Sequence, residues 1–323
     1  MTVCQIPFTA LQELPELKQV EIRLREVCHG KDNYTQLFSS IIQGGKRLRP
    51  ALVILCGSFT GTSHSKLIDT AAAVELIHAA SLIHDDVIDC AESRRNKPTI
   101  SAQWGQHQAV LYGDFLFARA FSLLTDHGLT NILNNMTKAI RLMCQGEIEQ
   151  FALRFNCIQT ESSYMSYIQK KTAFFLSACC QAGAEISDLP PIQQKLLTSF
   201  GLLLGYAFQL TDDLLDYCGN EKYTGKPVLH DLTAGYLTLP VIRLLYNPSY
   251  SLNLRRIIET RDFSAENMQY IRQALYDTGI INEIQQKAAS LILKAKENLD
   301  SLPNEPTREI LSSLADYILS REL

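Results

Sequence analysis

The sequence predicts an all-α protein, and three observations support that prediction. Apolar residues recur with helical rather than alternating spacing in nearly every segment. Glycine and proline separate these segments, and no low-complexity linker interrupts the 323 residues. The chain is 46% hydrophobic and 20% charged, which suits a globular protein with a sizeable core. We therefore expect one domain over residues 1–323, with central helices that are apolar on every side and buried.

The expected helices follow one another along the chain, each with helically spaced apolar residues and a breaker nearby. In order, they are a helix that opens at Pro50 and those over residues 67–92, 131–155, 162–186, 191–218, 264–279, 281–299 and 307–323. Pro191 suits the first turn of its helix, where a missing N–H removes no hydrogen bond. Ser264 and Gly279 suit the two ends of theirs.

Composition narrows the range of functions. A net charge of −4 and a pI of about 6.0 argue against a nucleic-acid partner. The nine cysteines show no disulfide framework or zinc spacing, which predicts reduced thiols in a cytoplasmic protein. We expect no signal peptide and no transmembrane segment, because the longest apolar stretch, residues 200–210, is too short to cross a bilayer.

Two of the expected helices carry the same acidic pattern, Asp-Asp-x-x-Asp, among apolar residues. The first pattern is Asp85, Asp86 and Asp89, and the second is Asp212, Asp213 and Asp216. Positions i and i+4 share a helix face, so the outer aspartates of each pattern project together. Clustered carboxylates on an apolar helix are costly unless a cation joins them. Carboxylate ligands on rigid helices suit Mg²⁺, which binds through one or two carboxylates together with substrate phosphate.

Other interpretations of the aspartates remain open. Two acidic helix ends in solvent would need no ligand, although acidic residues are typical of helix N-termini rather than of the ends of apolar runs. An EF-hand calcium loop fits poorly, because the loop glycine and spaced oxygen ligands are missing. His84 and Asp85 together leave open an HD-type metal phosphohydrolase, but no other histidines are candidates for the remaining ligands.

Basic residues accompany both acidic patterns. They are Lys46, Arg47 and Arg49 after a glycine break, Arg94 and Arg95 just past Asp89, Lys171 beside Thr172, and Lys226 after the second pattern. Cations at a glycine break that leads into a helix N-terminus suit a phosphate. His78 lies on roughly the same face as Asp85 and is a candidate phosphate donor. The ordinary alternatives are an exposed basic turn, a snorkelling lysine and a satisfied core histidine.

Taken together, these segments resemble the trans-isoprenyl diphosphate synthases. The resemblance covers most of the chain and rests on GGKRLRP, ELIHAASLIHDDVIDCAESRRNKPT, VLYGDFLFARA, GEIEQ, QKKTAFFLSACCQAGA, GYAFQLTDDLLDY and TGKPVLHDLTAGYLTLP, in the order of the family. Within that family, the sequence is most similar to the large catalytic component of heptaprenyl or hexaprenyl diphosphate synthases. The resemblance implies a single-domain orthogonal bundle of about ten or more helices around a central hydrophobic cavity. It also implies condensation of an allylic diphosphate with isopentenyl diphosphate.

The resemblance assigns roles by position. The six aspartates would hold about three Mg²⁺ ions around the allylic diphosphate, which Arg94, Lys171 and Lys226 would also contact. Isopentenyl diphosphate would lie against the basic segment and its neighbours, namely Lys46, Arg47, Arg49, His78 and Arg95. Thr172 and Gln209 would face the developing cation. Tyr236 is a departure, because many relatives carry lysine there, and one diphosphate contact would then be missing.

Small residues before Asp85 predict a long product. Ala80 and Ser81 lie one helical turn before it, and Ile77 lies two turns before it. A turn is about 5.4 Å, close to one isoprene unit, so a large side chain there would stop the growing chain early. By resemblance the product would have about six to eight isoprene units. The alternative is that small residues only let two helices pack closely.

The resemblance also implies partners and leaves competing functions. Family members form homodimers, and the heptaprenyl type works with a small accessory subunit and supplies quinone side chains, delivering product to a membrane. A shorter-chain farnesyl or geranylgeranyl diphosphate synthase remains an alternative. So does a non-catalytic subunit, although such a chain would be expected to lose aspartates or basic residues. A class I terpene cyclase usually has a different second metal motif, which argues against it.

Overall fold

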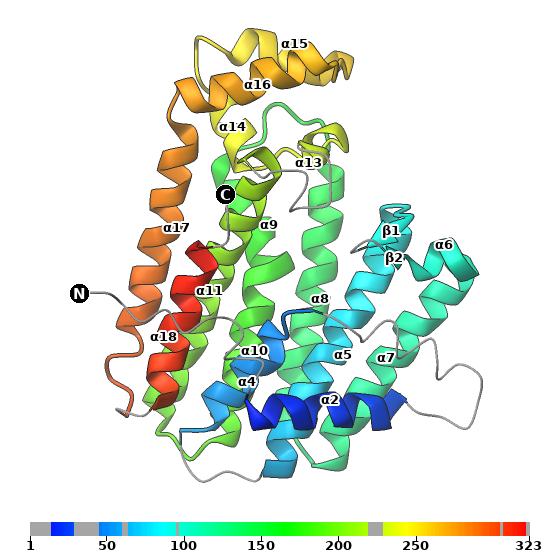
Figure 1. Ribbon diagram of the computed structural model, residues 1–323, viewed down its shortest axis with the longest axis vertical. Coiled ribbons are helices and arrows are strands. Elements are labelled where there is room, and N and C mark those ends of the chain that lie inside the picture. The colour runs from blue at the N-terminus through cyan, green and yellow to red at the C-terminus, as the bar shows by residue number, and fades with distance from the viewer. Residues whose placement is uncertain are drawn as a thin grey trace. The chain divides into compact units, whose positions relative to one another are not determined.

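The computed structural model describes residues 14–28, 45–59, 64–94, 97–218, 229–303 and 306–320. Over these ranges the chain forms helices joined by turns, with one small hairpin (Figure 1), which confirms the all-α class. The chain divides into two compact units, which are described separately. One holds Met1–Ile140, Ala178–Thr198 and Ser301–Ser313, and the other holds Arg141–Ser177, Ser199–Asp300 and Leu314–Leu323. The single domain expected from the sequence stays a prediction.

The first unit is built around one long apolar helix. Its elements are α2 (Pro15–Cys28), α4 (Leu48–Gly57), α5 (His64–Ile88), β1 (Ser93–Arg94), β2 (Lys97–Pro98), α6 (Ile100–Trp104) and α7 (Gln106–Asp126). The long helix α5 packs along α7 and against α4 and α2 (Figure 1). Residues 67–77 of α5 are buried without a break, so this part of the helix is enclosed on every side, as its apolar sequence predicts.

The same helix is long and apolar enough to cross a membrane, judged by length and composition. However, 72% of its apolar window is buried inside the protein, and a core helix passes the same test. Packing against neighbouring helices therefore accounts for its apolar sequence.

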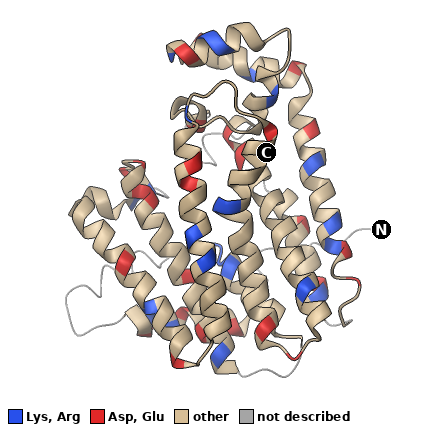
Figure 2. Cartoon of the chain, turned by 180° about the vertical axis from the view of Figure 1, so that it is seen from behind, with Lys and Arg blue, Asp and Glu red and all other residues tan. Residues whose placement is uncertain are grey.

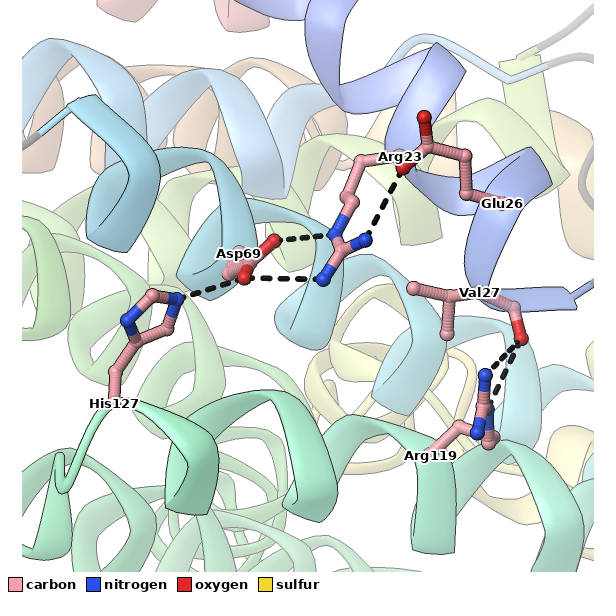
Figure 3. Close-up of polar contacts among 6 residues, drawn as sticks. All are labelled: Arg23, Glu26, Val27, Asp69, Arg119 and His127. Carbon is pink, nitrogen blue, oxygen red and sulfur yellow. Dashed lines mark hydrogen bonds and ion pairs between the residues drawn. The ribbon is translucent and has the colours of Figure 1, made fainter.

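Side-chain hydrogen bonds and ion pairs attach α2 to the rest of the first unit (Figure 3). Arg23 of α2 donates to Oδ1 of Asp69 on α5 at 2.6 Å, and His127 Nε2 lies 2.7 Å from Oδ2 of the same carboxylate. Asp69 is only 7% exposed, so the guanidinium of Arg23 and the contact with His127 offset the desolvation of its carboxylate. Arg119 of α7 donates to the carbonyl of Val27 at 2.7 and 3.0 Å, which satisfies an acceptor at the C-terminal end of α2.

The second unit contains α9 (Glu161–Ile168), a π-helical turn (Gln169–Ala173), α13 (His230–Thr233), α14 (Leu239–Leu245), α15 (Ser251–Thr260), α16 (Ala265–Asp277) and α17 (Ile280–Glu297). Residues of both units belong to α8 (Thr130–Ala152), α10 (Phe174–Ile186), α11 (Pro191–Cys218) and α18 (Pro306–Leu319). The short helix α14 packs against α9, α15, α16 and α17, and most of its side chains are buried.

Ion pairs tie α14 to two of its neighbours. Arg243 donates to Glu161 of α9 at 3.1 Å and to Glu283 of α17 at 2.8 Å, and Lys287 also donates to Glu161. Burial raises the pKa of Glu161, but its hydrogen bonds with Arg243 and Lys287 outweigh that effect, so the pKa is lowered. Acidic and basic residues are interspersed along α17, the long helix at the right of Figure 2, as is typical of a solvated helix held by ion pairs.

The predicted helix bounds are largely confirmed. α11 covers residues 191–218 as expected, and α16 begins after Ser264 and ends before Gly279. α4 begins at Leu48, before Pro50, which lies within its first turn, where proline is tolerated. The predicted helix over 67–92 was too long, because α5 ends at Ile88 and the chain then turns into the β1–β2 hairpin.

The largest difference is in the predicted helix over residues 162–186. It is interrupted by the π-helical turn Gln169–Ala173, where the N–H of Phe174 bonds to the carbonyl of Gln169, five residues earlier. Such turns insert one extra residue into a helix and are frequent at functional sites. This one contains Lys171 and Thr172, two of the predicted site residues.

Candidate functional site

The two acidic patterns lie in different units, the first at the end of α5 and the second on α11. In the first, Asp85 is partly buried, Asp86 is 7% exposed and Asp89 is exposed. The N–H of Asp89 donates to the carbonyl of Asp85 at 2.8 Å, so the outer aspartates lie one helical turn apart although α5 has ended. The buried middle residue and the more accessible outer pair therefore have different surroundings.

The β1–β2 hairpin brings Arg94 to the first pattern. Both Nε and Nη2 of Arg94 lie 2.8 Å from Oδ1 of Asp86, a charge-assisted contact that offsets the burial of this carboxylate. Arg94 therefore contacts the first acidic pattern, and its predicted contact with a diphosphate stays a prediction. Arg95, like Lys226, lies outside the described residues.

The basic segment before α4 separates into residues with different surroundings. Lys46 is exposed. Arg47 is the N-cap of α4 with φ of 50°, and its guanidinium forms ion pairs with Glu21 of α2 and with Glu75 of α5, the latter at 2.6 Å. The side chains of Arg47 and Glu75 are each 9% exposed, so this ion pair is buried. Through Arg47, the segment before α4 is joined to α2 and to α5. That placement gives Arg47 a structural role that its sequence neighbours do not share.

Arg49 and His78 come together as the resemblance requires. Nη1 of Arg49, on α4, lies 3.1 Å from Nε2 of His78 on α5. Both side chains are partly buried. Two potential phosphate donors from separate helices therefore share one place in the first unit, and their role in binding isopentenyl diphosphate stays a prediction.

The second pattern repeats the division between the middle and the outer residues. Asp212 is exposed, Asp213 is 5% exposed and Asp216 is partly buried. Oδ2 of Asp213 accepts from the hydroxyl of Tyr164 at 2.6 Å, and its Oδ1 accepts from Nε2 of Gln209 at 2.7 Å. Burial and the charges of Asp231 and Asp212 outweigh these two bonds and raise the pKa of Asp213 to about 8.

Asp216 also anchors the chain that follows the second pattern. Its carboxylate accepts from the backbone N–H groups of His230 and Asp231 at 3.0 and 3.2 Å, at the start of the short helix α13. A carboxylate at a helix N-terminus is favoured by the unpaired N–H groups there. Each carboxylate oxygen retains a second lone pair, so this role is compatible with metal binding.

The π-helical turn places both of its lysines beside α8. Lys171 Nζ lies 2.7 Å from Glu147 and 2.7 Å from Gln150, whereas Lys170 pairs with Glu149. The next residue, Thr172, is buried, and its hydroxyl donates to Oε1 of Gln209 at 2.7 Å. Thr172 and Gln209 are therefore in direct contact, and the predicted roles of Lys171, Thr172 and Gln209 toward substrate stay predictions.

Two glycines on neighbouring helices allow close packing against the π-helical turn. A Cβ on Gly146 of α8 would lie 2.8 Å from the backbone nitrogen of Lys171, and a Cβ on Gly205 of α11 would lie 2.4 Å from Cα of Ala173. Both distances are shorter than real Cβ contacts, so only glycine fits at either position without displacing backbone. The turn is therefore fixed by backbone packing from two sides.

The remaining predicted residues lie within the first unit, on α5. Ile77 and Ala80 are fully buried, and the hydroxyl of Ser81 donates to the carbonyl of His78 at 2.9 Å. Nε2 of His84 lies 3.2 Å from the carbonyl of Val110, and its ring packs against Phe117. These contacts of His84 account for it as a packing residue between α5 and α7. The part of Ile77, Ala80 and Ser81 in chain length stays a prediction.

Tyr236, the departure from the family pattern, packs against an arginine. The guanidinium carbon of Arg154 lies 5.3 Å from the centre of the Tyr236 ring, and Nε of Arg154 donates to the carbonyl of Ala234 at 2.7 Å. A cation–π contact of this kind is worth about 0.5–1 kcal/mol at an exposed site. A lysine in place of Tyr236 would lose that contact and place a like charge beside Arg154.

The oxygen donors of both patterns fit Mg²⁺. Within the ranges that the structure describes, no three His, Cys, Asp or Glu side chains form a metal site by themselves. Mg²⁺ does not need such a group, because it commonly binds through one or two carboxylates and completes its shell with water and phosphate. The outer aspartates of each pattern, Asp85 with Asp89 and Asp212 with Asp216, offer that partial donor set.

Sequence reasoning missed Tyr164, Glu147 and Gln150 as site residues. Glu147 and Gln150 lie within the segment GEIEQ at positions i and i+3, which share a helix face, and this polar pair among apolar residues is a signal for them. Tyr164 gives no such signal, because an aromatic residue in an amphipathic helix is typical of a core. The hairpin that carries Arg94 was also missed, since each strand has only two residues.

Comparison with known proteins identifies the family. The sequence matches the polyprenyl synthetase family model over residues 31–275. The heptaprenyl diphosphate synthase component 2 of Bacillus subtilis is 36% identical over 279 residues, which cover 86% of this chain and 80% of that protein.

Two solved structures are similar over nearly the whole chain. A decaprenyl diphosphate synthase from Rhodobacter capsulatus has a TM-score of 0.92 at 32% identity, covering 98% of this chain and 99% of that one. A polyprenyl synthase from Caulobacter crescentus, complexed with calcium and isoprenyl diphosphate, has a TM-score of 0.91 at 31% identity, covering 99% and 100%. The chain, with its two Asp-Asp-x-x-Asp helices, therefore belongs to the polyprenyl synthetase family.

Proposed function

We propose that this protein is a Mg²⁺-dependent prenyltransferase that condenses an allylic diphosphate with isopentenyl diphosphate to make a trans-polyprenyl diphosphate. The observation that supports it most is the repeated arrangement of the two acidic patterns. In each, a protein partner holds the buried middle aspartate, Arg94 for Asp86 and Tyr164 for Asp213. The outer aspartates lie one helical turn apart, which suits metal ions that a diphosphate also binds.

Different residues of this chain would have different roles in the proposed reaction. The two acidic patterns would hold Mg²⁺, chiefly through their outer aspartates, and the bound metal would neutralise charge on the departing diphosphate. Arg94 and Lys171 supply cations for the same leaving group. Arg49 and His78 supply donors for isopentenyl diphosphate. Exclusion of water from the site would protect an allylic cation from quenching.

The bond changes of the reaction balance without a further reactant. The allylic carbon–oxygen bond breaks, and the diphosphate leaves with the electron pair. The terminal alkene carbon of isopentenyl diphosphate then bonds to the allylic carbon, which leaves a tertiary cation at the methyl-bearing carbon. A proton then leaves the CH₂ between that carbon and the diphosphate-bearing carbon, and passes to the departed diphosphate. Oγ1 of Thr172 and Oε1 of Gln209 would stabilise the positive charge between these steps, since both oxygens carry lone pairs.

For the product, we propose a medium or long chain of the heptaprenyl class, for a quinone side chain. Small residues at positions 80 and 81 support this length. The names of relatives range from geranylgeranyl to decaprenyl, so product length is a matter for measurement. The Bacillus subtilis relative is named component 2, which supports a small accessory subunit as partner, and a homodimer is the alternative. We place the enzyme in the cytoplasm, with delivery of its product to a membrane.

Incubation of the purified protein with labelled isopentenyl diphosphate, farnesyl diphosphate and Mg²⁺ tests the proposal, with products sized by chromatography. We expect a polyprenyl diphosphate from the wild type and turnover abolished in Asp85→Ala and Asp212→Ala with helical circular dichroism unchanged. Asp126→Ala, at the exposed end of α7, is the matched control and should retain full activity. Near-normal turnover in either motif variant would contradict the proposed site. Activity that appears only after a second protein is added would favour a heteromeric enzyme.

A further inference from the structure

Four polar side chains form a continuous hydrogen-bonded relay inside the second unit. The hydroxyl of Tyr164 on α9 donates to Asp213 Oδ2 at 2.6 Å, and Gln209 Nε2 donates to Asp213 Oδ1 at 2.7 Å. The hydroxyl of Thr172, in the π-helical turn, then donates to Gln209 Oε1 at 2.7 Å. Tyr164 is fully buried, Asp213 and Thr172 are 5% and 7% exposed, and Gln209 is partly exposed, so water has little access to three of the four members.

This relay fixes which way the amide of Gln209 points. A side-chain amide has one end that only donates and one end that only accepts. Asp213 Oδ1 accepts from Gln209 whether the carboxyl group is charged or neutral, because a proton on that group would reside on the oxygen facing Tyr164. The NH₂ group of Gln209 is therefore committed to Asp213, and its carbonyl oxygen is turned toward Thr172.

The hydrogen bond with Gln209 also determines where the hydroxyl hydrogen of Thr172 points. Its hydroxyl hydrogen is used by Gln209 Oε1, so the lone pairs of its own oxygen remain as acceptors. Two oxygens, Gln209 Oε1 and Thr172 Oγ1, are thereby arranged with partial negative charge at one place. Preorganised dipoles of this kind stabilise charge that develops in a transition state, because they need no reorganisation during the reaction.

We propose that Tyr164 is a positioning residue for this pair of oxygens: by holding Asp213, it fixes the amide of Gln209 and, through it, the hydroxyl of Thr172. The proposal rests on the proposed prenyl transfer, in which the two oxygens face the allylic cation. Tyr164 itself touches neither substrate nor cation and acts only through Asp213.

The neighbouring Tyr167 offers a matched comparison. Both tyrosines lie on α9, both are buried, and their rings contact edge to face at 5.3 Å. The hydroxyl of Tyr164 donates to Asp213, whereas Tyr167 neighbours Gln159, whose buried Nε2 has no hydrogen bond among the described residues. Tyr→Phe at either position removes one buried hydroxyl from the same helix, so the structural effects should be alike and only Tyr164→Phe should affect the relay.

The experiment compares steady-state kinetics and thermal unfolding of wild type, Tyr164→Phe and Tyr167→Phe. We expect kcat to fall about tenfold in Tyr164→Phe, which corresponds to about 1.4 kcal/mol, within the range of one typical hydrogen bond. KM for isopentenyl diphosphate and the melting temperature should match those of Tyr167→Phe, whose kcat should stay near wild type. Equal kcat values in the two variants would overturn the inference.

A double-mutant cycle separates positioning from a general structural effect. Gln209→Met removes the amide at nearly constant volume and should itself lower kcat. If Tyr164 acts through Gln209, Tyr164→Phe should lower kcat no further in the Gln209→Met background. A full additive loss would overturn the inference.

A crystal structure of Tyr164→Phe gives a readout that is independent of turnover. We expect the distance between Thr172 Oγ1 and Gln209 Oε1 to exceed hydrogen-bonding range, and an unchanged distance would overturn the inference. The failures are distinguishable. A wild type without transferase activity would overturn the proposed function and with it the role of the relay, whereas an active wild type with an intact relay in Tyr164→Phe would overturn the inference alone.

Discussion

Replacement of Gly205 by alanine tests whether the π-helical turn sets the geometry of the site. A Cβ at this position would lie 2.4 Å from Cα of Ala173 and 3.0 Å from both its Cβ and its carbonyl oxygen. Ordinary contacts begin at 3.4 Å, so the closest pair must separate by 1.0 Å, the difference between 3.4 and 2.4 Å. The nearest atom is backbone, so α11 and the turn must move relative to each other.

That displacement should affect catalysis more than stability. Overpacking of a core position costs about 1–3 kcal/mol of folding free energy. Thr172 precedes Ala173, and Gln209 lies one turn after Gly205, so the hydrogen bond between them is displaced directly. A shift of about 1 Å in catalytic groups can reduce the rate by about 100-fold. We expect Gly205→Ala to lower kcat by about that factor in a protein that remains folded.

Denaturant unfolding and incorporation of labelled isopentenyl diphosphate measure the two effects. Gly128→Ala is the control, since Gly128 has φ of 66° and nothing within 4 Å of its would-be Cβ. It should lose about 1 kcal/mol of stability from backbone strain and keep its kcat. Adding Ala173→Gly should not rescue Gly205→Ala, because the closest contact is with Cα. Wild-type kcat in Gly205→Ala would refute the reasoning.

Three further variants test other contacts. Arg47→Met removes the ion pair with the buried carboxylate of Glu75. It should lower the free energy of unfolding, measured with denaturant, by about 3–5 kcal/mol. A loss below about 1 kcal/mol would contradict a stabilising role for this ion pair. Glu161→Gln should be less stable than wild type at neutral pH. Because the folded-state pKa of Glu161 is lowered, the difference in melting temperature should begin to shrink as the pH falls below the ordinary value of about 4.3 and should vanish only below the lowered pKa. A constant difference would show that charge is not its cause. Ser81→Phe should shorten the product seen by chromatography, whereas an unchanged length would place the growing chain elsewhere.

The sequence was sufficient for those features that local pattern determines. Apolar spacing and breakers predicted α11 between Pro191 and Cys218, because proline and the end of the apolar run mark its limits. The spacing of the aspartates predicted that Asp85 and Asp89 lie one turn apart, as they do. Motif resemblance also paired Arg49 with His78, which lie 3.1 Å apart.

Features that depend on distant partners could not be read from the sequence. The pattern Asp-Asp-x-x-Asp treats its members alike, but Asp213 differs because Tyr164, far away in sequence, holds it. Lys46 and Arg47 are adjacent cations, yet only Arg47 meets Glu75 in a buried ion pair. The π-helical turn interrupts a segment whose apolar pattern is continuous, and the close approach of Gly205 that accompanies it is a tertiary contact.

The ion pairs and hydrogen bonds of α2 have a practical consequence for truncation of the protein. Two buried acidic residues of α5 depend on α2 for their counter-charge. Arg23 of α2 pairs with Asp69, and Glu21 of α2 helps to hold Arg47, which pairs with Glu75. A truncated chain beginning after Cys28 would keep both carboxylates and lose part of their counter-charge. Helix α2, distant in sequence from both acidic patterns, is therefore a poor place for a deletion.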